Sequence, residues 1–264
     1  VEEHNDGATY TTIYDYYTLG NLAKLTDNQG NITTITYDSL GRKLRMNDPD
    51  MGVWNYEYNN VGNLIKQTDA AGQQLVFQYD AINRLTQKTI QAAQSVTYQY
   101  DDPQKSFSKG RLTKVIYQAG STEFFYDNLG REIQSKKTVD SSQYTVARTY
   151  DSLDRLMTLT YPDGEIVSYT YNSQGIETVI GNAPYISNIN YSPTGQIIKQ
   201  ENGNGTFTTY NYNPQTLRLE HMSTFDQQQA IIQDFAYTFD SVGNIMNIAD
   251  GVNTGTQSFD YDHL

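Results

Sequence analysis

The chain repeats a Tyr-Asp-x-x-Gly motif at a nearly constant step over almost its whole length. The first residue of the motif, here called the anchor, recurs every 21 residues from Tyr16 to Tyr100 and then at steps of 20 to 27 residues. Self-similarity at such a period is typical of repeat proteins, in which each unit packs only against its neighbours. The sequence therefore predicts a single array over residues 1–264, with about 11 repeats and with anchors at Tyr16, Tyr37, Tyr58, Tyr79, Tyr100, Tyr126, Tyr150, Tyr171, Tyr191, Tyr212, Phe239 and Tyr261.

Each repeat carries two turn signals. The position four residues after the anchor accepts Gly, Asn or Asp, the residues that best tolerate a left-handed backbone. A second cluster of turn residues lies midway, as in Asp27-Asn28-Gln29-Gly30 and Asp69-Ala70-Ala71-Gly72. Two turns in each repeat leave two segments of the usual strand length. The glycines predicted at the turns that follow the anchors are Gly20, Gly41, Gly62, Gly110, Gly130, Gly175, Gly195 and Gly243.

The segments between the turns have the composition of strands. Nine of the twelve anchors have an aromatic residue two positions earlier, as in Tyr56 and Tyr58. Residues two apart on a strand share one face, so the pattern predicts aromatic ladders along the sheet, with each cross-strand pair contributing about 0.2–1 kcal/mol. No helical period of apolar residues is present. The fold class predicted is all-β: tandem β-hairpins in a curved, spiralling antiparallel sheet, because a sheet of about 22 strands is too wide to stay flat.

Composition restricts the function. Only 37% of the residues are hydrophobic and 23 are Tyr, which suits a thin sheet with a wetted face better than a thick core. Nucleic acid requires a basic surface, and with a net charge of −12 we do not expect it as a partner. Cysteine is absent, which excludes disulfides and thiolate sites. No apolar run is long enough to span a bilayer.

Catalysis finds little support in the sequence. The three histidines, His4, His221 and His263, lie far apart and have no associated Ser or Cys motif. No His or Cys spacing indicates a metal site, and calcium at the Asp-rich turns would need six to eight converging oxygens. A glycosidase-like pair of carboxylates stays open, although nothing singles out two of them. We expect no enzyme activity, no cofactor and no metal.

Some repeats depart from the template. Residues 102–109 are inserted after Tyr100, and the polar stretch 226–229 lengthens another step. Each insertion is either drift in loop length or a contact loop for a partner. Arg148 stands where an aromatic partner of Tyr150 is expected, as a feature of the ladder face or as a tolerated surface residue.

The combination of Tyr-Asp-x-x-Gly-Arg-Leu, a midway Asp-x-x-Gly turn and x-Tyr-x-Tyr-Asp resembles the YD repeat of the Rhs family from about Tyr14 to Leu264. That family includes bacterial Rhs toxins, the C component of ABC-type insecticidal toxin complexes and the shell of the teneurins. The resemblance implies hairpins wound into a hollow shell that holds a toxic C-terminal segment. The Asp-Pro-x-Gly-Leu region that the family links to self-cleavage does not occur here, so neither self-cleavage nor toxin activity carries over to this chain.

Two functions follow from this resemblance and from the residues. The favoured one is a non-catalytic section of an encapsulating shell, a fragment of an exported bacterial protein at the cell surface or secreted, whose partners are the rest of its polypeptide and its toxin cargo. The alternative is an adhesion module that binds carbohydrate through exposed aromatic ladders. Unpaired sheet edges would also allow edge-to-edge self-association.

Overall fold

The computed structural model describes residues 2–5, 8–91 and 94–261, and the regular elements of these residues are β-strands and turns. They confirm the predicted all-β class. The strands are β1 (Glu2–Asn5), β2 (Ala8–Thr11), β3 (Ile13–Tyr16), β4 (Leu22–Thr26), β5 (Ile32–Tyr37), β6 (Lys43–Asp48), β7 (Gly52–Tyr58), β8 (Leu64–Thr68), β9 (Gln74–Tyr79), β10 (Leu85–Ile90), β11 (Gln94–Tyr100), β12 (Leu112–Tyr117), β13 (Gly120–Tyr126), β14 (Glu132–Val139), β15 (Ser142–Tyr150), β16 (Leu156–Thr160), β17 (Ile166–Tyr171), β18 (Ile176–Ile180), β19 (Pro184–Tyr191), β20 (Ile197–Asn202), β21 (Phe207–Tyr212), β22 (Leu219–Phe225), β23 (Ile231–Phe239), β24 (Ile245–Asp250) and β25 (Gly255–Ser258).

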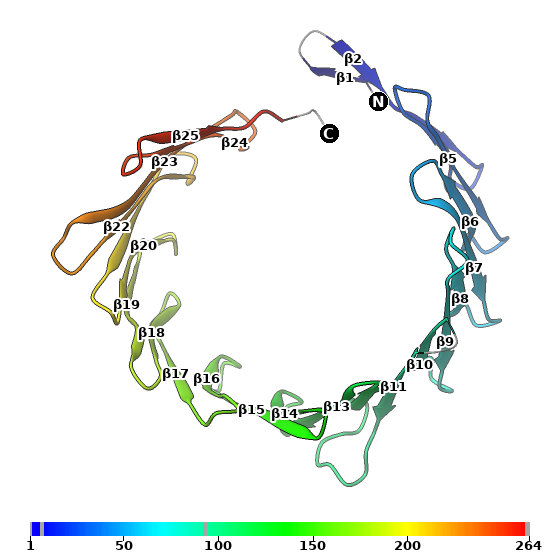
Figure 1. Cartoon of the computed structure of the whole chain (residues 1–264), viewed down its shortest axis with the longest axis horizontal. Coiled ribbons are helices and arrows are strands. Elements are labelled where there is room, and N and C mark those ends of the chain that lie inside the picture. The colour runs from blue at the N-terminus through cyan, green and yellow to red at the C-terminus, as the bar shows by residue number, and fades with distance from the viewer. Residues whose placement is uncertain (1, 6–7, 92–93, 262–264) are drawn as a thin grey trace. The chain divides into compact units, whose positions relative to one another are not determined.

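The chain divides into two compact units, with the boundary in the sequence between Tyr144 and Thr145. In the first unit each strand from β3 to β13 pairs antiparallel with the next strand in the chain, while β1 and β2 pair with each other. In the second unit the same order runs from β15 to β25. Consecutive hairpins therefore build each unit, and the strands from β5 to β11 follow a curved path (Figure 1).

A β-bulge lies beside each anchor that ends a strand. Eleven anchors form the last residue of an incoming strand, and Tyr261 lies beyond β25 outside any strand. In the pair β7–β8, Glu57 is opposite Lys66 but Tyr58 is opposite Leu64, so that Ile65 is the extra residue. The same shift occurs at the other ten anchors. Bulges bend a strand and increase its twist, which gives each repeat a built-in contribution to curvature.

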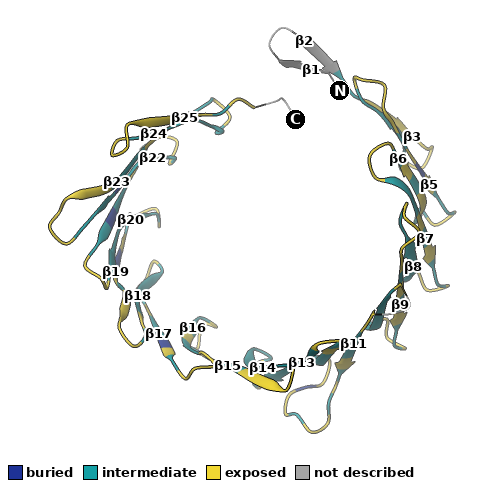
Figure 2. Ribbon diagram, viewed as in Figure 1, coloured by how far each residue is buried: buried dark blue, intermediate teal, exposed yellow. Residues whose placement is uncertain are grey.

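The sheet has very little enclosed core. The buried apolar side chains of the described residues are Ile35, Val167 and Ile189, and most others are half-buried or exposed (Figure 2). On β7, Tyr56 and Tyr58 are half-buried on one face while Glu57 between them is exposed. The two aromatic positions of this strand therefore share the better covered face. Cohesion must come from contacts between neighbouring strands rather than from a thick interior.

The predicted ladder of stacked rings is wrong. Among the described residues the ring pairs are Tyr17 with Tyr37 and Phe207 with Phe225, and neither pair joins two anchors. The reason is spacing: successive anchors are separated by an outgoing strand, which places them about 9.6 Å apart, beyond the usual distance between paired rings. Other groups therefore fill the space between anchors.

Most of the predicted turn glycines adopt the left-handed backbone. Positive φ angles occur at Gly20, Gly41, Gly62, Gly110, Gly130, Gly195 and Gly243, and the non-glycine residues Asn83 and Asp154 take the same conformation at the equivalent position. Gly175 does not have a positive φ, because its turn is one residue shorter. Asn172 N donates to Gly175 O, three residues later, whereas after Tyr37 the equivalent Asp38 N donates to Arg42 O, four residues later. A Cβ at Gly175 would lie 2.7 Å from the Tyr191 hydroxyl, so glycine is favoured at this position because a side chain would clash with Tyr191.

The part of the chain that the structure describes has no helix with the length and hydropathy needed to cross a bilayer.

Candidate functional site

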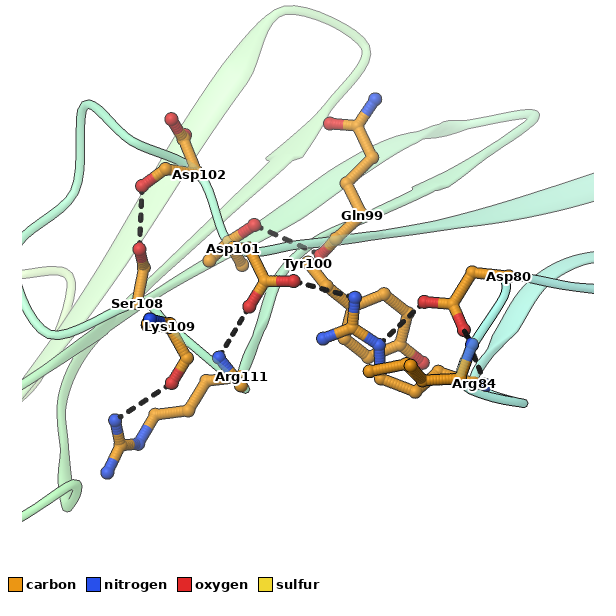
Figure 3. A network of polar contacts seen from close by, with 12 residues as sticks. Asp80, Arg84, Gln99, Tyr100, Asp101, Asp102, Ser108, Lys109 and Arg111 are labelled. Carbon is orange, nitrogen blue, oxygen red and sulfur yellow. Dashed lines mark hydrogen bonds and ion pairs between the residues drawn. The ribbon is translucent and has the colours of Figure 1, made fainter.

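Side chains of one repeat contact those of the next. Arg84 folds back on Asp80: its backbone N donates to Asp80 Oδ1 at 2.9 Å and its Nε donates to Oδ2 at 2.7 Å. The same guanidinium lies over the ring of the next anchor, Tyr100, 4.4 Å from its centre (Figure 3). A planar cation is thus held between a carboxylate and an aromatic face, both of which favour its charge.

This carboxylate–guanidinium–tyrosine arrangement recurs because the turn and the step recur. Its third member, the tyrosine, belongs to the following repeat. The arrangement therefore joins the side chains of two repeats, whereas the hairpin turns join them only through the backbone. At Arg84 the network extends to Asp101, which accepts from Nη2 at 2.6 Å. Two further copies, with the distance from guanidinium to ring centre, are Asp38–Arg42–Tyr58 at 4.9 Å and Asp151–Arg155–Tyr171 at 4.4 Å.

The anchor hydroxyls make a second contact between repeats. The acceptor is the backbone carbonyl of the first residue in the outgoing strand of the preceding repeat, the residue that pairs with the preceding anchor beside the bulge. This contact gives the anchor a reason to be Tyr rather than Phe, because the ring alone could not reach that carbonyl. The pairs are Tyr79–Leu64 (2.8 Å), Tyr100–Leu85 (3.0 Å), Tyr126–Leu112 (2.7 Å), Tyr171–Leu156 (2.8 Å), Tyr191–Ile176 (2.8 Å) and Tyr212–Ile197 (2.9 Å).

Acid should weaken these contacts. Hydrogen bonds from the backbone and the guanidinium of the arginine four residues later hold the pKa of Asp38, Asp80 and Asp151 below its usual value. A carboxyl whose pKa falls on folding stabilises the fold fully above about pH 4, and this stability is lost as the pH falls through the lowered pKa. We expect the free energy of unfolding, measured by urea titration, to fall below about pH 4. Asp80→Asn should reduce that dependence, and an unchanged slope would contradict the assignment.

The insertion after Tyr100 folds onto the sheet. Lys105, whose side chain is only 10% exposed, pairs with Glu123 at 3.1 Å and lies 4.5 Å from the centre of the Phe125 ring. Its Nζ also donates to Thr113 O at 2.9 Å, and the buried Ser108 donates to Asp102 O at 2.7 Å. These contacts tie the loop to its own sheet. By contrast, the residues Gln227, Gln228 and Gln229 of the other insertion are exposed.

The described residues do not assemble a hydrolytic triad around the histidine. His221 Nε2 lies 2.8 Å from Asp234 Oδ1, and Ser223 Oγ donates to the same oxygen at 2.7 Å. The carboxylate is therefore central, whereas a catalytic triad needs the imidazole between nucleophile and carboxylate. Within the described residues no group of three or more acidic or His side chains could hold a metal ion. The side chains of His4 and His263 lie outside the described part.

Arg148, which replaces an aromatic residue at its position, is half-buried on β15 opposite Leu159.

Comparison with known proteins finds relatives of the repeat. A model of the RHS repeat family matches residues 14–50, 58–96 and 150–183. Toxin subunit YenC1 of Yersinia entomophaga is 30% identical over 116 residues, which are 41% of this chain and 11% of that protein. Toxin subunit YenC2 of the same organism is 29% identical over 139 residues, or 50% of this chain and 14% of that protein.

Solved structures show the same fold. The crystal structure of TcdB2-TccC3 matches with a TM-score of 0.87 at 20% identity and covers 99% of this chain and 16% of that chain. The Tc holotoxin pore of Photorhabdus luminescens matches with a TM-score of 0.70 at 20% identity over 95% of this chain and 16% of that chain. The chain thus spans a small part of the length of each protein that it matches.

Proposed function

We propose that this chain is a non-catalytic wall segment of a toxin shell, because three stretches of it match the RHS repeat and it is similar in sequence to the toxin subunits YenC1 and YenC2. The shell encloses or presents an effector segment carried elsewhere on the same polypeptide. The observation that carries the proposal is the contact between repeats: the arginine and the anchor tyrosine of the template both reach from one repeat to its neighbour. The partners are then the rest of the polypeptide and its cargo, and the place of action is outside the bacterial cell.

The contacts of the anchors favour the function of a shell wall and not that of an adhesion surface. The rings that could stack on sugars are covered by guanidinium groups at Tyr58, Tyr100 and Tyr171. Their hydroxyls, at Tyr100 and Tyr171, are engaged with backbone carbonyls. Aromatic residues engaged in this way hold strands together and leave little free face for a carbohydrate. These three anchors therefore give the carbohydrate-binding alternative no support, whereas the anchor Tyr16 is 61% exposed.

Protease protection tests the proposal. In a polypeptide that carries this chain with the effector segment, we expect that segment to resist digestion that destroys the same segment expressed alone. Replacing Tyr79, Tyr100 and Tyr126 by Ala should open the wall and expose the segment, whereas Tyr144→Ala, at a side chain that is 49% exposed, should not. Equal digestion of the enclosed and the free segment in the unaltered protein would overturn the shell function.

A further inference from the structure

A pocket in the second unit has no role in joining repeats. It lies between the turn after β16 and the start of β19, has a volume of about 430 Å³ and is lined by Tyr161, Pro162, Asp163, Glu165 and Tyr185. Tyr161 is 41% exposed and Tyr185 is 49% exposed, so both rings are open to a ligand. Neither tyrosine is an anchor, and the template does not call for them.

One carboxylate of the pocket is held in place. Glu165 Oε1 accepts from the Tyr185 hydroxyl at 2.5 Å and from Asn182 N at 3.0 Å. Gly181 allows this approach, since a Cβ there would lie 2.4 Å from the same oxygen. The hydrogen bond from Tyr185 to Glu165 raises the pKa of that tyrosine, so it stays a neutral donor at physiological pH. Glu165 is thus presented to the pocket in a preorganised position.

The pocket has no cation of its own. Among the described residues neither Asp163 nor Glu165 forms an ion pair with Lys or Arg, in contrast to Asp38, Asp80, Asp127 and Asp151. Two carboxylates beside two phenol rings give a negative potential, and aromatic faces add to the attraction for a cation. The charge of the pocket therefore favours a cationic ligand over a neutral sugar or an anion.

The molecule itself shows which cation suits such a set of groups. In the arrangement of Asp80, Arg84 and Tyr100, a guanidinium lies between a carboxylate and a tyrosine ring. The pocket repeats the carboxylate and the tyrosine of that arrangement without the guanidinium. We propose that the pocket binds the guanidinium of an exposed arginine on a partner polypeptide, stacked on Tyr161 or Tyr185 and paired with Glu165. Arginine fits better than lysine because its planar fork stacks on a ring and bonds a carboxylate through two donors. This binding does not depend on the shell function.

Titration of the chain with N-acetyl-arginine amide, followed by NMR, tests the site. We expect saturable shifts at Tyr161, Gly181 and Tyr185, with the neutral isostere N-acetyl-citrulline amide at least tenfold weaker and the lysine analogue weaker than arginine. Equal binding of the citrulline and arginine compounds would overturn the proposal. So would a neutral disaccharide that shifts the same residues more strongly.

Two variants locate the interaction. Glu165→Gln should weaken arginine binding at least tenfold, because it removes the charge but keeps the shape. Tyr161→Ala, which leaves the hydrogen bonds of Glu165 intact, should weaken it several-fold. Asp226→Asn is the matched control, since Asp226 caps a turn of the same unit through backbone bonds from Gln228 and Ala230 and should leave binding unchanged. Unaltered affinity in both pocket variants, with their folds intact by circular dichroism, would place the binding elsewhere.

Discussion

Replacing Gly120 by Ala is expected to destabilise the first unit by about 3 kcal/mol, at the upper end of the cost of overpacking. Gly120 opens β13 opposite Val139, and a Cβ there would lie 1.8 Å from the Thr138 carbonyl oxygen and 2.8 Å from its carbon. The obstacle is backbone of the neighbouring strand, so no side chain can rotate away and the hairpin itself must move. Urea unfolding followed by circular dichroism measures the loss.

Substitutions at two other glycines serve as controls, because they measure the cost of replacing glycine by alanine without a steric clash. Gly72 has φ +78° and a Cβ there would meet no atom within 4 Å, so Gly72→Ala should cost only about 1–2 kcal/mol for its left-handed backbone. Gly255 does not have a positive φ, and a Cβ there would meet no atom within 4 Å. Gly255→Ala should therefore change the free energy of unfolding very little. A Gly120→Ala protein no less stable than the Gly72→Ala protein would show that the strand can yield.

Tyr100→Ala should also cost about 3 kcal/mol, the lower end for removing a large aromatic side chain, because Tyr100 is only half-buried. The substitution removes the ring under Arg84 and the hydroxyl that donates to Leu85 O at 3.0 Å. It also leaves Arg84 Nη1, which has no hydrogen-bond partner among the described residues, without its aromatic neighbour. The same urea titration gives the size of the effect.

A graded series divides the contributions of Tyr100. Tyr100→Phe keeps the ring and loses one hydrogen bond, which should cost about 1 kcal/mol. The double variant Arg84→Ala/Tyr100→Ala should lose less free energy of unfolding than the two single variants lose together, because the two side chains share one contact. Tyr144→Ala, at a side chain 49% exposed, is the control and should change stability little. Full additivity at Arg84 and Tyr100 would contradict a direct interaction.

Much of the local structure follows from the sequence because it depends on residues close together in the chain. The incoming strands end at the anchors, and seven outgoing strands begin at an aliphatic residue, namely Leu22, Leu64, Leu85, Leu112, Leu156, Ile197 and Ile245. Gly41 turns the chain with φ 77°, as expected of a glycine four residues after an anchor. Strand length, turn type and antiparallel order therefore need no knowledge of the rest of the molecule.

The sequence was less informative where a contact joins two repeats. Alternating aromatics predicted the shared face of Tyr56 and Tyr58 but also suggested ring stacking, which the strand spacing prevents. The Asp80–Arg84 bond was accessible from the motif, since both residues belong to one turn. The contact of Arg84 with the Tyr100 ring could not be predicted, because the two residues are 16 positions apart and only the strand register brings them together. The pocket around Glu165 was missed for the same reason.

What the sequence determined by itself is the repeat: its step, its two turns and its pair of strands, since each follows from the conformational preferences of a few consecutive residues. The tertiary structure decided what those strands do to one another. It placed a bulge beside each of eleven anchors, directed six anchor hydroxyls to the carbonyls of the preceding repeat, and folded Lys105 onto Phe125. These outcomes depend on register across the sheet, which sets distances between residues that the chain order leaves far apart.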